Sequence, residues 1–123
     1  MTRTILLVDD DMIFGATLGR QLSEAQYDVV TTRGSIAALR QLETDRPIDL
    51  LLADLKLPDG QPHGVALSKM ARLRRPGLPV IFMSGFPGLV REARLDEPVF
   101  EKPFHVGVLL DVISLRIGSG ARR

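Results

Sequence analysis

Short apolar runs alternate along the chain with longer stretches in which apolar residues recur at helical spacing. The runs are rich in Val, Ile and Leu, and they predict five strands, near residues 4–9, 27–31, 49–53, 78–83 and 99–101. Three of these runs are almost continuously apolar, which is typical of strands that helices cover on both faces. The alternation predicts an α/β fold: a doubly wound, five-stranded parallel sheet with helices on both faces.

The helical spacing predicts helices at 11–25, 35–43, 64–74 and 106–117. In the first helix Phe14, Leu18 and Leu22 stand four residues apart, so we expect them to form one buried stripe. The last helix has the clearest pattern, with apolar residues at i, i+3, i+4, i+7 and i+11, namely Val106, Leu109, Leu110, Ile113 and Ile117. We expect residues 1–118 to form the domain and residues 119–123 to be a flexible C-terminal tail.

The pattern is weakest between Ser84 and Val99. Pro87 and Pro98 bound any helix in this segment and leave residues 89–95, about two turns, to form it. Helices this short depend on packing, and the segment offers few apolar side chains. We therefore predict a fourth helix that is short or irregular, and mobile.

Composition narrows the functional classes. The chain has 123 residues, enough for one domain, and its 45% hydrophobic and 25% charged residues are those of an ordinary globular protein. The formal net charge of +1 does not favour a general nucleic-acid-binding protein, because affinity for phosphates needs a clustered basic surface. The absence of cysteine excludes disulfides, thiolate metal sites and a cysteine nucleophile. The first apolar run is too short for a signal peptide or a membrane span, so we expect a cytoplasmic protein without membrane contact.

The candidate chemistry lies where the predicted strands end. Asp9 and Asp10 follow the first strand, Asp54 the third, Ser84 the fourth and Lys102 the fifth. Ligands of open parallel sheets bind beyond the carboxyl ends of the strands, so these side chains should share one edge. Clustered carboxylates suit Mg²⁺, a carboxylate can act as a nucleophile toward phosphorus, and a lysine and a hydroxyl can bind phosphate oxygens.

Each of these residues also has a purely structural interpretation. Asp10 or Asp11 would cap the first helix, and Asp54 would begin a turn. Lys102 alone is most often a solvated charge, and Ser84 alone a turn residue. Taken together they favour a phosphate site, because independent turn residues have no reason to fall at four strand ends at once.

Four segments of the chain resemble the receiver domain of two-component response regulators: residues 5–11 (ILLVDDD), 49–60 (DLLLADLKLPDG), 79–85 (PVIFMSG) and 102–104 (KPF). They occur in the family's order and at nearly its spacings over essentially the whole chain. The resemblance implies a flavodoxin-like sheet of strand order 2-1-3-4-5. It also implies a cis peptide bond between Lys102 and Pro103.

The resemblance assigns roles to the strand-end residues. Asp54 resembles the phosphoacceptor, Ser84 the switch hydroxyl and Lys102 the lysine that pairs with the phosphoryl group. Asp9 and Asp10 resemble the acidic pocket for Mg²⁺, which Asp54 and the backbone carbonyl of Lys56 would complete. The implied function is uptake of a phosphoryl group from a sensor histidine kinase or a histidine phosphotransfer protein. The chain would be a signalling switch that assists its own phosphorylation and dephosphorylation, and not an enzyme.

Two regions depart from the family's pattern. Val99 stands where the family commonly has an aromatic residue that couples phosphorylation to output, and Gln61, Pro62 and His63 lengthen the loop after Asp54. A receiver-like interaction module that takes no phosphate is therefore the main alternative. A Mg²⁺-dependent phosphohydrolase of the haloacid dehalogenase type is less favoured, because it places a second aspartate where this chain has Lys56.

No effector domain follows the last predicted helix in this sequence, so we expect this chain to signal by binding an unknown downstream protein, without direct contact to nucleic acid. A receiver domain that is part of a hybrid kinase or a larger regulator fits the sequence equally well. Lys56 and Phe86 lie two residues after Asp54 and Ser84, at positions that in the family flank the path of the hydrolytic water. Their bulk predicts slow loss of phosphate.

Overall fold

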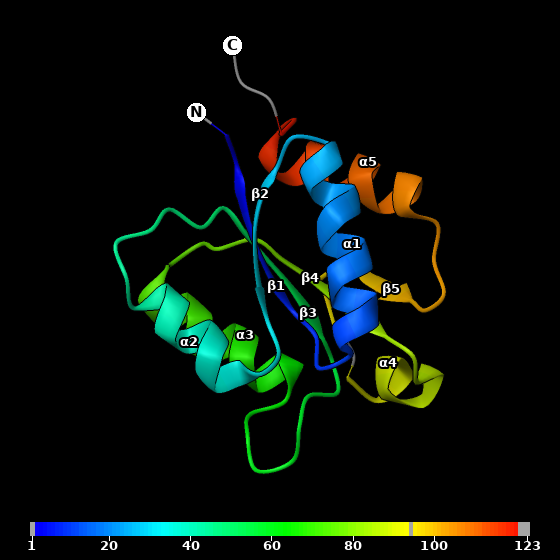
Figure 1. Cartoon of the computed structure of the whole chain (residues 1–123). Coiled ribbons are helices and arrows are strands. Elements are labelled where there is room, and N and C mark those ends of the chain that lie inside the picture. Colours follow the sequence, from blue (N-terminus) through cyan, green and yellow to red (C-terminus); the bar gives the residue numbers. More distant parts are fainter. Residues whose placement is uncertain (1, 94, 121–123) are drawn as a thin grey trace.

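A five-stranded, fully parallel sheet lies between two layers of helices in the computed structural model, which describes residues 2–93 and 95–120 (Figure 1). The strand order is β2-β1-β3-β4-β5, as predicted. The strands are β1 (Thr4–Val8), β2 (Asp28–Thr32), β3 (Leu50–Asp54), β4 (Val80–Ser84) and β5 (Val99–Glu101). Neighbouring strands run parallel because a helix connects each to the next.

The helices are α1 (Met12–Glu24), α2 (Ser35–Leu42), α3 (Gly64–Arg74), α4 (Pro87–Ala93) and α5 (Val106–Ile117). Figure 1 shows α1 and α5 on one face of the sheet and α2 and α3 on the other. The start of α1 is set by Asp11, whose carboxylate accepts a hydrogen bond from the backbone N–H of Phe14 at 3.0 Å. Of Asp10 and Asp11, the two candidates for this cap, Asp11 is the N-cap residue.

The core is divided by the sheet, because successive strand side chains point to opposite faces. In β1, Ile5 and Leu7 pack toward α1 and α5, whereas Leu6 and Val8 pack toward α2 and α3. Every residue of β1, β3 and β4 is buried. These three strands form a rigid centre, and their carboxyl ends hold the polar residues described below.

Three strands begin one or two residues later than predicted, β2 at Asp28, β3 at Leu50 and β4 at Val80, and at β2 and β4 the residues left out are apolar. Tyr27 is buried but lies in the turn before β2, where Gln26 has a φ of 72°. The Tyr27 hydroxyl donates to the carbonyl of Gly118 at 2.7 Å, so this side chain anchors the end of α5. Leu78 is likewise buried ahead of β4, and its N–H donates to Arg75 and closes a turn. At β2 and β4, an apolar residue that is buried but not paired in the sheet explains the difference.

The fourth helix is short, as predicted, with seven residues. It begins at Pro87 rather than at residue 89, because proline is tolerated in the first turn, where its missing N–H is not needed. Leu89 and Val90 pack against the face of the sheet that α2 and α3 cover. Among the α4 side chains that the structure describes, Leu89 and Val90 are the ones that pack on this core, which gives the helix little support.

Part of the predicted tail lies against the domain. Gly118 ends α5 with a φ of 86°, a conformation that glycine adopts without strain. Gly120 is buried, and a side chain there would collide with the backbone of Ala25 and Gln26. Residues 121–123 lie outside the described residues, so the proposed division at 118 stays a prediction.

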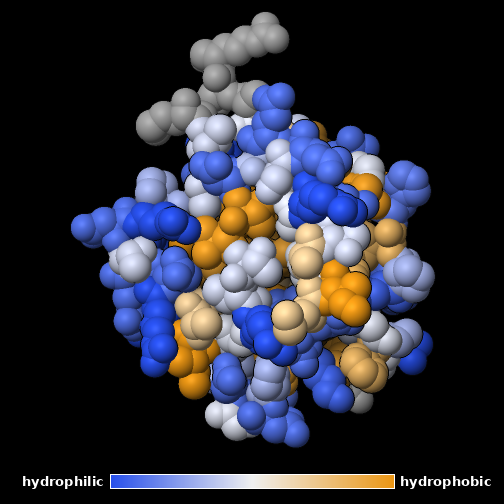
Figure 2. All heavy atoms as spheres, viewed as in Figure 1, coloured by the Kyte–Doolittle hydropathy of each residue, from blue (hydrophilic) through white to orange (hydrophobic). Residues whose placement is uncertain are grey.

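The face of the molecule in Figure 2 carries mostly hydrophilic residues. On the face shown in Figure 2, hydrophilic residues surround several separate apolar patches. The most exposed large apolar side chains in the described part of the chain, Ile13, Leu73 and Leu115, lie on three different helices. Among residues 2–93 and 95–120, no helix combines the length and the hydropathy needed to cross a lipid bilayer.

Candidate functional site

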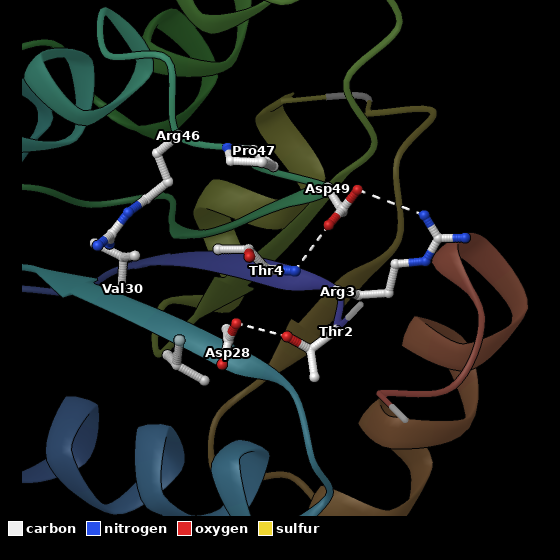
Figure 3. A pocket seen from close by; sticks show the side chains of 9 residues that line it. Thr2, Arg3, Thr4, Asp28, Val30, Arg46, Pro47 and Asp49 are labelled. Carbon is white, nitrogen blue, oxygen red and sulfur yellow. Dashed lines mark hydrogen bonds and ion pairs between the residues drawn. The ribbon is translucent and has the colours of Figure 1, made fainter. Parts of the chain in front are cut away.

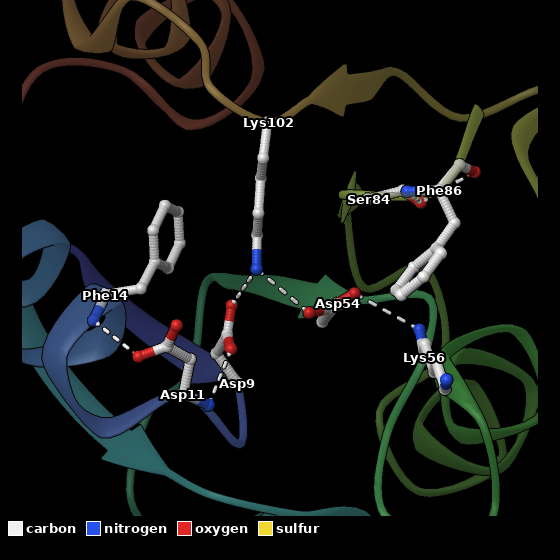
Figure 4. Close-up of polar contacts among 8 residues, drawn as sticks. All are labelled: Asp9, Asp11, Phe14, Asp54, Lys56, Ser84, Phe86 and Lys102. Atoms are coloured by element: carbon white, nitrogen blue, oxygen red, sulfur yellow. Dashed lines mark hydrogen bonds and ion pairs between the residues drawn. The ribbon is translucent and has the colours of Figure 1, made fainter.

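The predicted strand-end residues meet at one edge of the sheet (Figure 4). Asp9 follows β1, Asp54 ends β3 and Lys102 follows β5. The Lys102 side chain reaches across this edge, and its Nζ lies 2.7 Å from Asp9 Oδ2 and 2.9 Å from Asp54 Oδ2. The peptide bond between Lys102 and Pro103 is cis, as the family resemblance implied. One ammonium group thus bridges carboxylates from two strands.

Lys102 stays positively charged in this setting. Burial by itself lowers the pKa of Lys102, but the hydrogen bonds from Asp9 and Asp54, together with their negative charges, outweigh it and raise that pKa. The Lys102 side chain is 19% exposed, so water screens these interactions only in part. Lys102 therefore contributes a fixed positive charge to the site.

Asp9 is the most deeply buried of the three clustered aspartates, Asp9, Asp10 and Asp54. It is 1% exposed, and burial raises the pKa of its carboxyl group more than the hydrogen bonds from Lys102 and from the Asp11 N–H lower it. The negative charge of Asp54 acts in the same direction as burial. A further cation beside Asp9 would relieve this excess of negative charge.

The acidic residues form a group that fits a divalent metal ion. Asp9, Asp10 and Asp54 each offer a carboxylate oxygen, and these oxygens lie within 4.8 Å of one another. Asp9 and Asp54 are buried, whereas Asp10 is exposed and opens the group to solvent. A few carboxylates with room for water are the ligand set that Mg²⁺ prefers.

Asp54 is held in place from two sides. Its Oδ2 accepts from Lys102, and its Oδ1 accepts from the backbone N–H of Lys56 at 3.1 Å. The N–H of Lys56 thus positions Asp54, and the role of its carbonyl toward a metal stays a prediction. Gly64 lies so close to the backbone of Asp54 and Leu55 that a side chain there would collide with it. Glycine at this position allows α3 to begin beside the end of β3.

Ser84 lies at the predicted strand end but its hydroxyl is engaged elsewhere. It is buried, accepts from the N–H of Phe86 at 3.0 Å and donates to the carbonyl of Phe86 at 3.1 Å. To bind a phosphoryl oxygen, the hydroxyl must give up the Phe86 carbonyl. These two hydrogen bonds tie Ser84 to the segment between β4 and α4.

Lys56 and Phe86 lie together at the mouth of the site. The Lys56 Nζ is 4.7 Å from the centroid of the Phe86 ring, an attractive cation–π arrangement. Both residues line a hollow that also contains Asp10 and Asp54. The two positions that the sequence marks as bulky thus lie beside the carboxylates.

Sequence reasoning missed one residue of the site, Phe14. Its spacing with Leu18 and Leu22 predicts a buried stripe, and those two leucines are buried. Phe14 is only partly buried, and its ring centroid lies 4.1 Å from the Nζ of Lys102. Its place in the first turn after the strand-end aspartates was the available signal.

The lengthened loop after Asp54 has a structural role that the sequence did not indicate. Gln61 Oε1 accepts from the N–H of Ile36 at 3.3 Å, and the hydroxyl of Ser35 donates to the carbonyl of Pro62. The loop therefore caps the start of α2, where Gly34 has no side chain to do so.

His105 also acts structurally: its Nδ1 accepts from the Gly107 N–H at the start of α5.

A second hollow lies at the opposite end of the sheet, near the start of β1 (Figure 3). Several of its polar groups contact one another, although the Nε of Arg3 is buried without a hydrogen-bond partner among the described residues. Asp49 accepts from the N–H of Thr4 at 2.8 Å and lies 3.6 Å from Arg3, and Asp28 accepts from Thr2 at 2.6 Å. This hollow adds no group to the strand-end site.

The fold and the site define a class of protein, a doubly wound α/β domain with a lysine and an acidic group at the carboxyl edge of its sheet. The family model for the response regulator receiver domain matches residues 5–113. The chain belongs to this family. Receiver domains are signalling switches of two-component systems, and they normally bind Mg²⁺ at an acidic pocket such as the one formed here.

Individual relatives agree with this membership. The response regulator receiver protein CpdR of Brucella abortus (strain 2308) is 30% identical over 115 residues, which cover 90% of this chain and 93% of that protein. The alkaline phosphatase synthesis transcriptional regulatory protein PhoP of Bacillus subtilis (strain 168) is 31% identical over 68% of this chain, but the match spans only 34% of PhoP.

Solved structures give the same result. A response regulator receiver protein from Sinorhizobium medicae WSM419 matches with a TM-score of 0.85 and 25% identity over 98% of both chains. A CheY-like receiver domain protein from Methanospirillum hungatei JF-1 matches with a TM-score of 0.81 and 27% identity, over 95% of this chain and 94% of that one.

Proposed function

We propose that this receiver domain takes a phosphoryl group onto Asp54 from a phosphohistidine and signals by binding another protein. The observation that carries the proposal is the bridge from Lys102 to Asp9 and Asp54, with atom separations of 2.7 and 2.9 Å. It supports a nucleophilic carboxylate beside a fixed positive charge, the pair that phosphoryl transfer requires.

Asp54 would act as the nucleophile. A carboxylate oxygen of Asp54 attacks phosphorus, the bond from phosphorus to the donor imidazole nitrogen breaks, and that nitrogen keeps the electron pair. The N–H of Lys56 orients the carboxylate for this attack through its hydrogen bond to Oδ1. In the phosphorylated state Lys102 would turn one of its donors to a phosphoryl oxygen, and Ser84 would donate to another.

Mg²⁺ would be held by Asp10 and Asp54 with the help of Asp9 and the backbone carbonyl of Lys56. When bound, it would neutralise negative charge on the phosphoryl oxygens. Asp10 would supply the solvent-exposed ligand of the group, and Asp9 and Asp54 the buried ones. We expect Asp10→Ala to weaken Mg²⁺ binding in calorimetric titration; unchanged affinity would place the metal elsewhere.

The partners follow from the chemistry. The phosphodonor is a sensor histidine kinase or a histidine phosphotransfer protein, and the downstream partner is a protein contacted by a face other than the family's usual one. Val99 supports this difference, because it packs toward α2 and α3 whereas Phe100 packs on the opposite face and does not replace it. We place the protein in the cytoplasm, with its donor, and expect no direct contact with nucleic acid.

The proposal is tested by incubating the protein with acetyl phosphate and following its intact mass. We expect one added phosphoryl group in Mg²⁺ and none in EDTA. Asp54→Asn should take up none, while Asp59→Asn, which changes a nearby exposed aspartate, should behave as the parent protein does. Labelling of Asp54→Asn at the parent rate would show that another residue is the acceptor.

A further inference from the structure

The ammonium group of Lys102 has three donors, and the two carboxylates account for two of them. Its remaining side faces the ring of Phe14, whose centroid is 4.1 Å from Nζ (Figure 4). The face of an aromatic ring attracts a cation, most strongly where water is largely excluded. Lys102 is therefore held by two carboxylates and one ring.

The ring of Phe14 is itself fixed by its neighbours. Its backbone N–H donates to the capping Asp11, which sets the first turn of α1. Its ring lies 5.9 Å from that of Phe104 at 79°, and Phe104 lies 5.5 Å from Phe100 at 66°. Near-perpendicular pairs at these distances are favourable, so the three rings form a row in which Phe104 supports the Phe14 ring and Phe100 packs against Phe104.

We propose that Phe14 is a positioning residue that holds Lys102 for phosphoryl transfer to Asp54. The proposal rests on the proposed function of Asp54. A neutral ring suits this task better than a third carboxylate, because it attracts the ammonium without adding negative charge where the phosphoryl group must enter. Its attraction is also weaker than a charge-assisted hydrogen bond, so Lys102 can turn a donor to a phosphoryl oxygen and remain over the ring.

The contact can be tested by NMR on unphosphorylated protein with ¹³C-labelled lysine. The chain has three lysines, Lys56, Lys69 and Lys102. Lys102 lies over Phe14 and Lys56 over Phe86, whereas Lys69 is exposed on α3. Ring currents should shift the Hε signals of Lys102 and Lys56 upfield of those of Lys69.

Variants assign the effect to one ring. Phe14→Leu should return the Lys102 signal to an ordinary position and leave that of Lys56 unchanged. Phe86→Leu should do the reverse, and Phe14→Tyr should preserve both shifts. An unshifted Lys102 signal in the parent protein overturns the proposal without any variant, and so does a shift that survives Phe14→Leu.

The positioning role is tested by the initial rate of phosphoryl uptake from acetyl phosphate at saturating Mg²⁺. We expect Phe14→Leu to slow uptake roughly 3- to 10-fold, as loss of a partly buried cation–π contact predicts, and Phe14→Tyr to stay within about twofold of the parent. Phe100→Leu is the matched control, because it removes a ring from the same row at a position that pairs with Phe104. It should also stay within about twofold.

Two outcomes separate the possible failures. Equal slowing by Phe14→Leu and Phe100→Leu would show that Phe14 matters only for packing, and would overturn the positioning role. Absence of uptake by the parent protein would overturn the proposed function and the positioning role with it, while the lysine shifts would still show whether the contact exists.

Discussion

Replacing Lys102 with methionine removes the positive charge from the site while keeping most of the apolar stem of the side chain. The change leaves Asp9 and Asp54, whose side chains are 0% and 9% exposed, without their shared cation. Two hydrogen bonds of 2.7 and 2.9 Å are lost with it. Without metal, the hydrogen bonds that the contacts described for this site leave to the two buried carboxylates come from the backbone N–H groups of Asp11 and Lys56, which carry no full positive charge.

The magnitude follows from the geometry. Carboxylate oxygens no more than 4.8 Å apart repel by about 3.5 kcal/mol or more at an effective dielectric constant of about 20. Removal of one partner from a buried ion pair typically costs about 3–5 kcal/mol, because the other charge stays buried. We therefore expect Lys102→Met to lower the free energy of unfolding in EDTA by about 3–5 kcal/mol.

The assay is urea unfolding followed by circular dichroism, in EDTA and in excess Mg²⁺. Lys69→Met is the matched control, because Lys69 is an exposed lysine on α3, and its effect should stay within about 0.5 kcal/mol. Mg²⁺ should stabilise Lys102→Met more than the parent, since the ion restores a positive charge that the parent still has. A loss below about 1 kcal/mol in EDTA, or equal losses for both variants, would refute the reasoning.

Three further predictions concern other parts of the chain. Lys56→Ala and Phe86→Ala should each lose phosphate roughly 2- to 10-fold faster than the parent, because the two side chains lie together beside the carboxylates and would hinder the hydrolytic water. Equal phosphate lifetimes in mass spectrometry would exclude such hindrance. The hydrogen bond from Arg72 lowers the pKa of Glu97. The ion pair between these residues therefore stabilises the fold fully above the ordinary glutamate pKa, and this stabilisation is lost as the pH falls through the lowered pKa. At neutral pH the free energies of unfolding of the parent and Glu97→Gln should differ by less than about 1 kcal/mol. In urea titrations this difference should shrink toward acid pH, and a difference that grew would show that the ion pair does not stabilise the fold. Hydrogen exchange should be fast throughout α4 (Pro87–Ala93), and strong protection there before phosphorylation would contradict its weak packing.

The hydrophobic pattern was sufficient to predict the sheet and its helices, because burial on one or both faces imposes a period that the sequence carries locally. The strand boundaries were predicted less accurately where a buried residue is not paired in the sheet. Tyr27 and Leu78 are buried residues next to strands, but a tertiary contact holds Tyr27 and a turn holds Leu78. The spacing of apolar residues does not distinguish such residues from residues that are paired in a strand.

The strand-end residues were predictable for a different reason. Parallel strands end at one edge, so the order of elements alone places Asp9, Asp54 and Lys102 near one another. The contacts of Phe14 and Gln61 were not predictable in this way. Each depends on the direction of a side chain toward a residue far along the chain, Lys102 in one case and Ile36 in the other.

The most direct test of the account is to locate the phosphoryl group chemically. After incubation with acetyl phosphate and Mg²⁺, borohydride reduces an aspartyl phosphate to homoserine, and peptide mass spectrometry identifies the converted residue. The account predicts conversion of Asp54 alone, in a Mg²⁺-dependent reaction that EDTA abolishes. Conversion of Asp9 or Asp10 instead, or phosphoryl uptake with no converted aspartate, would contradict it.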